Sequence, residues 1–252
     1  MTKLTITIVS PHQDDAALSL GSFIFHRKES SINIVNCYTV SEYSPFYKGV
    51  NRAGVMKKRC KEDAAFRNHT PKKKIRFINL DEPDGPIRLN ERNMDALLAE
   101  RPLNDLDRVH LSSLRQGMAE HIKGLLLLPL GVGGHIDHNL ACLAGLSLIK
   151  ENSSIAFYLD VPYWLRTSIS KIQERIQYIE SLAAISLTPY VDPFREIWDK
   201  RLLSQIYSSQ ITAREVLQIV NAPFMGEIIV APTNSIAKKL ALQAIGWTDL
   251  NH

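Results

Sequence analysis

Short apolar runs alternate with longer amphipathic segments along most of the chain. The apolar runs are rich in β-branched residues and leucine, which is typical of buried strands, and they cover residues 4–9, 32–39, 75–80, 125–130 and 155–159. Helical spacing predicts helices at residues 15–28, 52–68, 108–123 and 137–150. Strands that alternate with helices favour βαβ units, so we expect a mostly parallel sheet flanked by helices.

The pattern is weaker in the last part of the chain. It predicts helices at residues 170–182 and 194–208 and a final apolar run at residues 228–231, and residues 81–86 predict a loop. No internal repeat, linker or low-complexity segment divides the sequence. A chain of 252 residues can bury roughly three quarters of its unfolded surface in one domain. We therefore predict a single α/β domain over residues 1–252, with a more variable C-terminal part.

Composition and charge are those of an ordinary globular protein, with 45% hydrophobic and 22% charged residues and a net charge of +4. The densest basic run, Lys72-Lys73-Lys74 beside Arg76, is interpreted as a solvated loop. No basic helix with interleaved aromatic residues supports nucleic-acid binding, so we expect no nucleic-acid partner.

Cysteine usage and hydropathy favour the cytoplasm. Cys37, Cys60 and Cys142 are far apart and form no Cys-x-x-Cys pair, which argues against a disulfide framework or a thiolate zinc site. The N-terminal apolar run is too short for a signal sequence, and no stretch reaches the roughly 18 consecutive apolar residues of a membrane span. We expect a cytoplasmic protein with no membrane span.

Two short runs of histidine and aspartate carry the chemistry. Ser10-Pro11-His12-Gln13-Asp14-Asp15 follows the first predicted strand, and Gly134-His135-Ile136-Asp137-His138 follows the fourth. Ligands bind at the carboxyl ends of the strands in such sheets, and both runs fall at that edge. Either run alone is more often a helix cap or a polar helix start, but both runs at one edge favour a functional site.

The two runs supply a set of metal ligands. His12 and Asp15 are three residues apart in a turn that leaves a strand, and His138 can complete a set of three. Two imidazoles and one carboxylate suit Zn²⁺ with an open position for water. The same donors suit Fe²⁺, so the identity of the metal stays open. When bound, zinc lowers the pKa of water from about 15.7 to roughly 7.

The remaining polar residues of the two runs are candidates for proton transfer. Asp14 cannot easily face the same point as Asp15, which leaves it free to act as a general base. His135 is placed to donate to a developing oxyanion or to the leaving amine, and Asp137 to hold an imidazole by a hydrogen bond. The predicted catalytic residues are therefore Asp14, His135 and Asp137.

The sequence resembles the PIG-L/LmbE-like zinc-dependent N-deacetylases. They share the His-x-Asp-Asp and His-x-Asp-His runs, and further similarity lies in the helix with Arg59 and Glu62, in residues 80–85 and in residues 158–163. The resemblance covers residues 4–165 and leaves residues 166–252 as a variable C-terminal region. It implies a Rossmann-like α/β fold. By this resemblance the metal ligands are His12, Asp15 and His138, the base is Asp14, and the acid or oxyanion donor is His135. It also implies N-acetylglucosamine conjugates as substrates, among them glycolipids, thiol-cofactor precursors and antibiotic or aminoglycoside intermediates.

Three residues are predicted to contact the substrate. Arg59 and Asp84 match positions that bind substrate in some members of the family, although a helix ion pair and a turn aspartate explain them equally well. Tyr163, or its neighbour Trp164, is a candidate for contact with a sugar face, with burial in the core as the alternative.

The sequence also departs from the family pattern. Gln13 replaces the usual proline and Ala16 the usual glutamate, and Gly133 stands where some members carry tyrosine. None of these is a metal ligand, so the changes affect the expected pocket shape more than the expected reaction.

We therefore expect a zinc-dependent amidohydrolase that removes acetyl from an N-acetylated amino sugar. One alternative is a thiol-conjugate amidase of the same family. A second alternative is a non-catalytic α/β protein that binds a sugar or nucleotide, although no Gly-x-Gly-x-x-Gly follows the first strand. Homo-oligomerisation is left open.

Overall fold

The computed structural model describes most of the chain. The described residues are 4–27, 30–70, 74–91, 93–99, 101–149, 154–194, 197–221, 225–232, 236, 240 and 242–246. The end of the first predicted helix and the lysines at positions 72 and 73 lie outside these residues. No described helix is long and apolar enough to cross a membrane.

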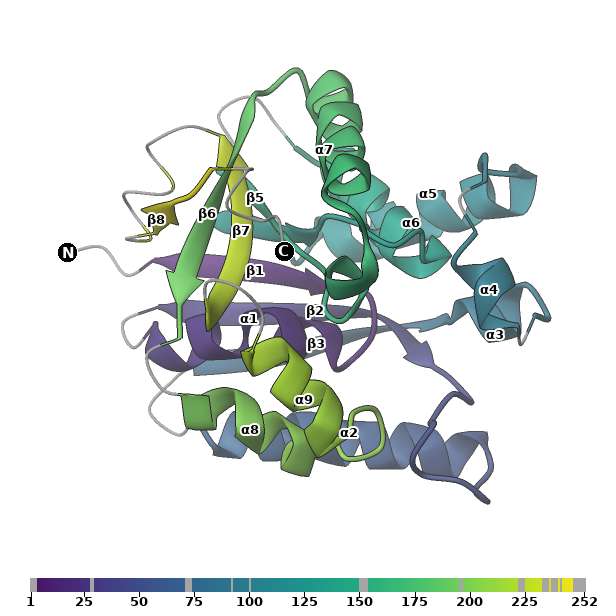
Figure 1. Cartoon of the computed structure of the whole chain (residues 1–252). Helices are drawn as coiled ribbons and strands as arrows, with labels where there is room; N and C mark the ends of the chain where they lie inside the picture. The colour runs from purple at the N-terminus through teal and green to yellow at the C-terminus, as the bar shows by residue number, and fades with distance from the viewer. Residues whose placement is uncertain are drawn as a thin grey trace.

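One twisted sheet of eight strands forms the centre of the molecule, in the order β3-β2-β1-β4-β5-β7-β6-β8 (Figure 1). The strands are β1 (Thr5–Ser10), β2 (Ser31–Val40), β3 (Lys74–Pro83), β4 (Leu125–Pro129), β5 (Ile155–Tyr158), β6 (Leu187–Pro193), β7 (Gly226–Pro232) and β8 (Gln243–Ala244). The five strands from β3 to β5 are parallel, whereas β7, β6 and β8 pair antiparallel with their neighbours. This sheet confirms the predicted α/β class.

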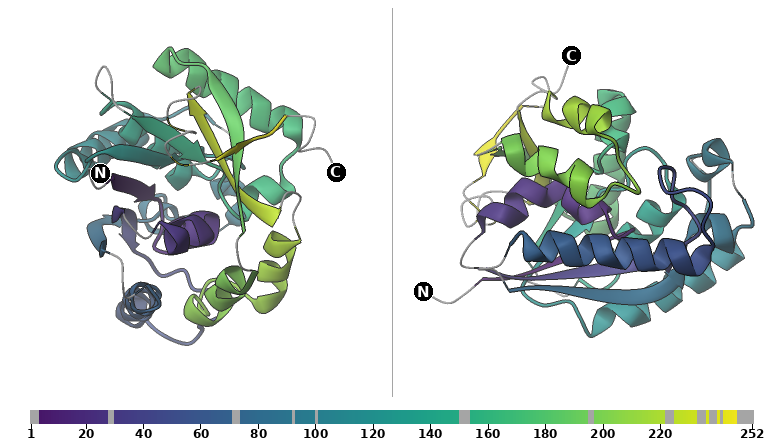
Figure 2. Two further views of the ribbon diagram at one scale, coloured as in Figure 1. Left: turned by 90° about the vertical axis from the view of Figure 1, so that its left-hand side faces the viewer. Right: turned by 90° about the horizontal axis from the view of Figure 1, so that it is seen from below.

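Helices cover both faces of the sheet (Figures 1 and 2). The helices are α1 (Asp15–His26), α2 (Arg52–Asn68), α3 (Gly85–Arg88), α4 (Met94–Leu97), α5 (Asp105–Ala119), α6 (Ile136–Leu146), the 3-10 turn η1 (Tyr163–Arg166), α7 (Ile169–Ala183), α8 (Ile197–Ile206) and α9 (Ala213–Val220). Helices α1 and α2 share one face with α8, while α5 and α6 pack together on the other. Segments far apart in sequence therefore lie side by side.

The five predicted strands are present and the final apolar run lies within β7, but the sequence pattern missed β6 and α9, as well as the short elements α3, α4 and β8. β6 contains Pro189 and Pro193, which weaken a strand signal because proline cannot donate to the ladder. α9 has only eight residues, and its start is fixed by a capping box of Thr212 and Glu215. Several predicted boundaries were also wrong: β3 continues into the expected loop as far as Pro83, and α5 begins and ends earlier than predicted.

The C-terminal region is joined to the sheet and to α1. Helix α1 is kinked at Leu20, which frees backbone N–H groups inside the helix. The Glu227 carboxylate on β7 accepts the N–H groups of Ser22 and Phe23 at 2.9 and 2.6 Å. The Lys200 ammonium of α8 lies 2.5 Å from the same carboxylate. The Glu227 carboxylate of this buried ion pair thus provides acceptors for the N–H groups that the kink leaves free. In this way the C-terminal region supports the helix that follows the first His/Asp run.

Candidate metal centre and active site

The carboxyl ends of β1 and β4 place the two His/Asp runs next to each other. The two strands are hydrogen-bonded neighbours at the centre of the sheet, and the chain continues from β1 to β2 on one side and from β4 to β5 on the other. This is the point where the strand order reverses, and such a point leaves a crevice for a ligand.

The loop after β1 is shaped by a buried serine. The Ser10 hydroxyl donates to the His12 carbonyl at 2.5 Å and accepts the Ala16 N–H at 2.9 Å. This turn carries the chain directly into α1 and presents His12, Asp14 and Asp15 within four residues. The backbone N–H of His12 also donates to the Asp15 carboxylate at 2.7 Å, which fixes that carboxylate relative to the loop.

The loop after β4 contains three glycines with positive φ, at positions 131, 133 and 134. At Gly133, with φ of 84°, an added Cβ would lie 2.7 Å from the Tyr163 Cβ. Glycine is therefore required for the loop to pass under Tyr163. The loop delivers His135 as the N-cap of α6, with Asp137 and His138 in the first turn of the helix.

His12, Asp15 and His138 bring their donor atoms together, and we call them the metal group. One ligand atom from each residue lies within 4.8 Å of the other two. The Asp15 Oδ2 is 3.1 Å from the His12 Nδ1 and 3.2 Å from the His138 Nε2. The His138 Nε2 is buried, and apart from this contact with Asp15 it makes no well-aligned hydrogen bond among the described residues. A buried ring nitrogen that faces a carboxylate is the arrangement expected of a metal ligand.

Each imidazole of the metal group has a buried carboxylate as the hydrogen-bond partner of the ring nitrogen that faces away from Asp15. The His12 Nε2 lies 3.0 Å from the Asp137 Oδ2, and the His138 Nδ1 lies 2.6 Å from the Asp160 Oδ1. When each of these ring nitrogens carries the proton, the opposite nitrogen keeps its lone pair for a metal. The structure therefore fixes the ring orientation of both histidines.

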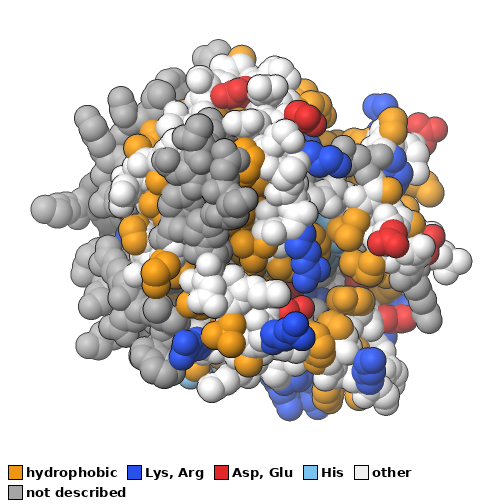
Figure 3. Space-filling model, viewed as in Figure 1, with side chains coloured by type: hydrophobic (Ala, Val, Ile, Leu, Met, Phe, Trp, Pro, Cys, Tyr) orange, Lys and Arg blue, Asp and Glu red, His pale blue; other side chains and the backbone are white. Residues whose placement is uncertain are grey.

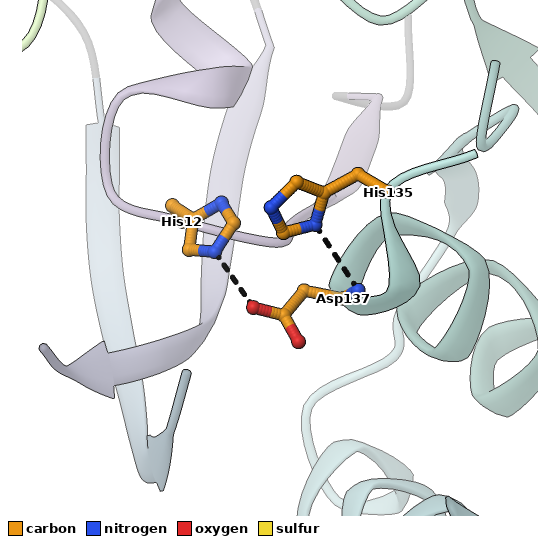
Figure 4. A group of neighbouring side chains, drawn as sticks. All are labelled: His12, His135 and Asp137. Atoms are coloured by element: carbon orange, nitrogen blue, oxygen red, sulfur yellow. Dashed lines mark hydrogen bonds and ion pairs between the residues drawn. The ribbon is translucent and has the colours of Figure 1, made fainter. Parts of the chain in front are cut away.

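A second group, formed by His12, His135 and Asp137, also has donor atoms within 4.8 Å of one another (Figure 4). Its carboxylate is already saturated. The Asp137 Oδ1 accepts from Arg88 at 2.8 Å, and its Oδ2 accepts from the Gly85 N–H at 2.8 Å besides facing His12. Asp137 thus acts as a partner of His12, and the metal group is the better ligand set.

Sequence reasoning missed Asp160 and Arg88 as site residues. Asp160 is fully buried beyond the end of β5, and its Oδ2 accepts the N–H groups of Gly131 and Val132 at 2.8 and 3.1 Å. One carboxylate therefore holds both the glycine loop and His138. The only sequence signal was its place after a predicted strand, within the segment that resembles the deacetylases.

The pKa values of the metal group reflect the close packing of two imidazoles and buried carboxylates. Burial lowers the pKa of His12, but its hydrogen bonds to Asp137 and Asp15 outweigh burial and raise it to about 9. For His138, Asp15 and Asp160 likewise overcome burial and raise the pKa to about 10. Burial raises the pKa of Asp15, yet the two imidazoles hold it well below its usual range. Protons on the two imidazoles thus supply the positive charge in the absence of a metal.

His135 behaves differently from the two imidazoles of the metal group. Burial lowers its pKa to about 3, so the ring is neutral at pH 7. Its Nδ1 accepts the backbone N–H of Asp137 at 3.2 Å, which assigns the ring proton to Nε2. His135 therefore presents an N–H donor to the site.

Asp14 lies beside the metal group but faces another partner. Its Oδ1 accepts from the Arg59 Nη2 at 2.5 Å, and Arg59 is 3% exposed. Burial raises the pKa of the Asp14 carboxyl, and the Arg59 guanidinium opposes this shift. The predicted substrate residue Arg59 is thus an ion-pair partner of the predicted base, and its guanidinium also lines the cavity.

The other two predicted substrate residues also reach the site. Asp84 is buried and caps α3 by accepting the Ile87 N–H at 3.2 Å. The Tyr163 ring lies 4.9 Å from the ring of His138 and 5.7 Å from that of His135, and it is only partly buried. Trp164, in contrast, belongs to the core. Both Asp84 and Tyr163 face the cavity described next.

A cavity of about 560 Å³, the site cavity, opens over these residues. Its lining comes from the segments that follow each of the strands β1 to β5, from α2 through Arg59, and from the α8–α9 connection with the first turn of α9. The lining residues that are not yet placed include Tyr43, Phe46, Met94, Gln210, Ile211 and Glu215. Figure 3 shows the hollowed face, where hydrophobic side chains lie beside Lys and Arg side chains. The C-terminal region thus builds one wall of the site.

The solved structures that resemble this chain include several deacetylases. The zinc-inhibited form of teicoplanin deacetylase Orf2 has a TM-score of 0.62 at 18% identity, covering 92% of this chain and 99% of that one. N,N'-diacetylchitobiose deacetylase from Pyrococcus horikoshii gives 0.54 at 13%, covering 90% and 84%. The conserved protein TT1542 from Thermus thermophilus gives 0.53 at 19%, covering 91% and 95%. The chain therefore has the fold of these deacetylases. No family model matches the sequence, and no curated protein matches it significantly.

Proposed function

We propose that this protein is a zinc-dependent hydrolase of the PIG-L/LmbE-like type, which removes the acetyl group from an N-acetylated amino-sugar conjugate. The observation that carries the proposal is the metal group, in which two imidazoles converge on Asp15 while Asp137 and Asp160 hold their other ring nitrogens. The His138 Nε2 is buried and makes no well-aligned hydrogen bond among the described residues, and the Asp15 carboxylate lies 3.2 Å from it, so a metal between the two residues would have both as ligands.

The residues present fit zinc. Two ring nitrogens and one carboxylate oxygen are the donors of a catalytic zinc site with an open coordination position. His12, Asp15 and His138 would hold the ion, with Asp137 and Asp160 orienting the two imidazoles. When bound, zinc supplies a Lewis acid and lowers the pKa of water to roughly 7. Fe²⁺ suits the same donors, so metal analysis forms part of the test.

The chain's own residues divide the proton transfers. Asp14 accepts a proton from the attacking water, and Arg59 holds the carboxylate in place and in its charged form. His135 is neutral and donates from Nε2 to the oxygen that gains negative charge in the transition state. Asp137 takes part in no proton transfer, because both of its oxygens are hydrogen-bonded.

The substrate class rests on the cavity and on the similar structures. Asp84 and Tyr163 line the site cavity beside the metal group, where a hydroxyl and the face of a sugar ring would meet them. Proteins of the same fold are named as deacetylases of teicoplanin and of N,N'-diacetylchitobiose. We assign this chain a small amino-sugar substrate on these grounds.

The same proposal covers the setting of the enzyme. The three cysteines are free thiols, which supports action in the reducing cytoplasm. The acidic site cavity favours a small, neutral acetamido sugar over a nucleic-acid backbone. We assign one domain to residues 1–252, and the support for this is that β6, β7 and β8 extend the same sheet.

The test combines metal analysis with acetate release. Protein loaded with one equivalent of zinc should release acetate from N-acetylglucosamine glycosides, and Asp14→Asn should lower kcat by at least about 100-fold with zinc still bound. Asp105→Asn is the matched control, since Asp105 is exposed on α5 and does not line the site cavity. Excess zinc is avoided because a similar deacetylase has a zinc-inhibited form. Full activity in Asp14→Asn would refute the assigned mechanism, and a chain that binds no metal would favour a binding protein.

A further inference from the structure

A second cavity of about 820 Å³ adjoins the site cavity. Four residues line both cavities, which shows that the two spaces meet: they are Leu98, Gly133, Arg166 and Thr167. The second cavity extends from the glycine loop after β4 along the first turns of α7. We call it the basic chamber, for the side chains described next.

The two cavities differ in charge. Among the described residues, the site cavity is lined by five carboxylates (Asp14, Asp15, Asp84, Asp95 and Glu215), by Arg59 and Arg166, and by His12 of the metal group. The basic chamber is lined by four cations and one carboxylate: Arg101, Arg166, Lys171 and Arg175 against Glu174. The zinc ion that the metal group would hold offsets the carboxylates of the site cavity, so a negatively charged group is drawn to the excess positive charge of the basic chamber.

Two of the cations in the basic chamber lack a partner in the described part of the chain, and a third is only partly satisfied. Arg101 is paired with Asp107 at 2.5 Å and is therefore largely neutralised. The side chains of Arg166 and Lys171 form no ion pair or hydrogen bond with any described residue. Arg175 donates from Nε to the Leu130 carbonyl at 2.7 Å, but its Nη2 is buried and has no hydrogen-bond partner among the described residues.

The rest of the lining suits a substituent of moderate size. Apolar side chains form part of the wall, among them Leu98, Pro102, Leu103, Leu143 and Tyr178. Thr167 and Ser168, at the N-terminus of α7, also line the chamber. The dipole of this helix adds to the positive potential there. Cations at one side and apolar walls at the other form an amphipathic pocket next to the reaction centre.

We propose that the basic chamber binds an anionic substituent, a carboxylate or a phosphate, that is attached to the amino sugar. This inference rests on the proposed function and specifies its substrate class. The acetamido group and the neutral sugar ring occupy the site cavity, and the anionic substituent passes Arg166 at the junction to reach Lys171. Arg166 is thus a specificity residue that separates charged from uncharged conjugates.

The first experiment compares two glycosides of N-acetylglucosamine of similar size. The carboxymethyl glycoside is anionic and the 2-hydroxyethyl glycoside is neutral, while N-acetylglucosamine 1-phosphate tests phosphate. One exposed ion pair changes an equilibrium constant by roughly twofold to fivefold, so two pairs predict a preference of about tenfold in kcat/KM for an anionic substrate. Whichever of the two anionic substrates has the larger kcat/KM relative to the neutral glycoside identifies the substituent as a carboxylate or a phosphate.

Variants test which residues create the preference. Lys171→Gln and Arg166→Gln should each lower the ratio of anionic to neutral kcat/KM by about threefold, mainly through KM, and the double variant should abolish it. Arg115→Gln removes the same charge from an exposed site on α5 and should leave the ratio unchanged. Equal kcat/KM for all three substrates in the unaltered protein, or a ratio insensitive to both variants, would overturn the inference.

A binding measurement separates this inference from the proposed function. Calorimetry of the metal-free protein with carboxymethyl glucosaminide and with 2-hydroxyethyl glucosaminide needs no catalysis. Tighter binding of the carboxymethyl compound than of the 2-hydroxyethyl compound, with the difference lost in the double variant, supports the basic chamber even if no acetate is released. Equal binding of the two amines together with active hydrolysis would refute the chamber and leave the hydrolase intact.

Discussion

Asp160 offers the sharpest test of how the metal group is built. Its carboxylate accepts from His138 at 2.6 Å and from the Gly131 and Val132 N–H groups at 2.8 and 3.1 Å. In Asp160→Asn one oxygen becomes an NH₂ group, so the side chain cannot accept from the imidazole and from both amides. The change also removes the negative charge that strengthens the bond to His138.

The expected loss is in metal affinity. Removal of a carboxylate that orients a histidine ligand typically weakens metal binding by about 10-fold to 100-fold, or roughly 1.4–2.7 kcal/mol. Zinc affinity is measured by competition with a chromogenic chelator at pH 7.5, for the unaltered protein, for Asp160→Asn and for Asp105→Asn as the control. Circular dichroism and thermal unfolding of the metal-free proteins check that the fold survives the change.

The outcomes are distinct. A folded Asp160→Asn variant that binds zinc within twofold of the unaltered protein would show that Asp160 does not set the ring orientation of His138. Reduced affinity with an unchanged control would confirm it. Some loss of stability, about 1–3 kcal/mol, is expected as well, because either the two buried backbone N–H groups or the His138 ring N–H loses its acceptor.

The same contacts give three further predictions. Zinc affinity should rise with pH from 6 to 8, because the two imidazoles of the metal group have pKa values raised to about 9 and about 10 and must release their protons before the metal binds; pH-independent affinity in competition titrations would contradict this. Arg59→Gln should move the acid limb of the kcat/KM profile to higher pH, because the guanidinium that opposes the raised pKa of Asp14 is lost; an unshifted limb would separate Arg59 from the base. Lys200→Met should lower the free energy of unfolding by about 3–5 kcal/mol in urea titrations, since it leaves the Glu227 carboxylate buried without its cation, and adding Glu227→Gln should recover part of the loss.

The sequence was most informative where spacing along the chain and spacing in the fold coincide. The β-branched runs predicted β1 to β5, and the His/Asp runs after β1 and β4 meet because those two strands are neighbours. His12 and Asp15 share one turn, so their convergence could be anticipated from the sequence. The approach of His138 to this turn follows from the parallel sheet and from its reversal of strand order.

Contacts that depend on strand order or on tight turns could not be predicted. Asp160 faces His138 because β5 lies beside β4, and the place of this aspartate in a segment that resembles the deacetylases did not show that the two residues meet. Arg88 reaches Asp137 through the short turn after β3, where the absence of a side chain at Gly85 lets its backbone N–H approach the same carboxylate. The cavity wall from the C-terminal region comes from Gln210 and Ile211 in the α8–α9 connection and from Glu215 on α9, a helix too short for its periodicity to be recognised.

The buried pair of Glu227 and Lys200 bears on how far this chain can be shortened. Every motif residue that resembles the deacetylases lies before residue 166, so a fragment ending there would retain all the proposed ligands and both proton-transfer groups. Such a fragment would leave the N–H groups at the α1 kink without their acceptor and expose the edge of β5 that β7 covers. The part that carries the motifs is therefore not an independent module. Grafting new C-terminal regions onto it to change selectivity would succeed only if they supply a carboxylate that accepts the N–H groups at the α1 kink.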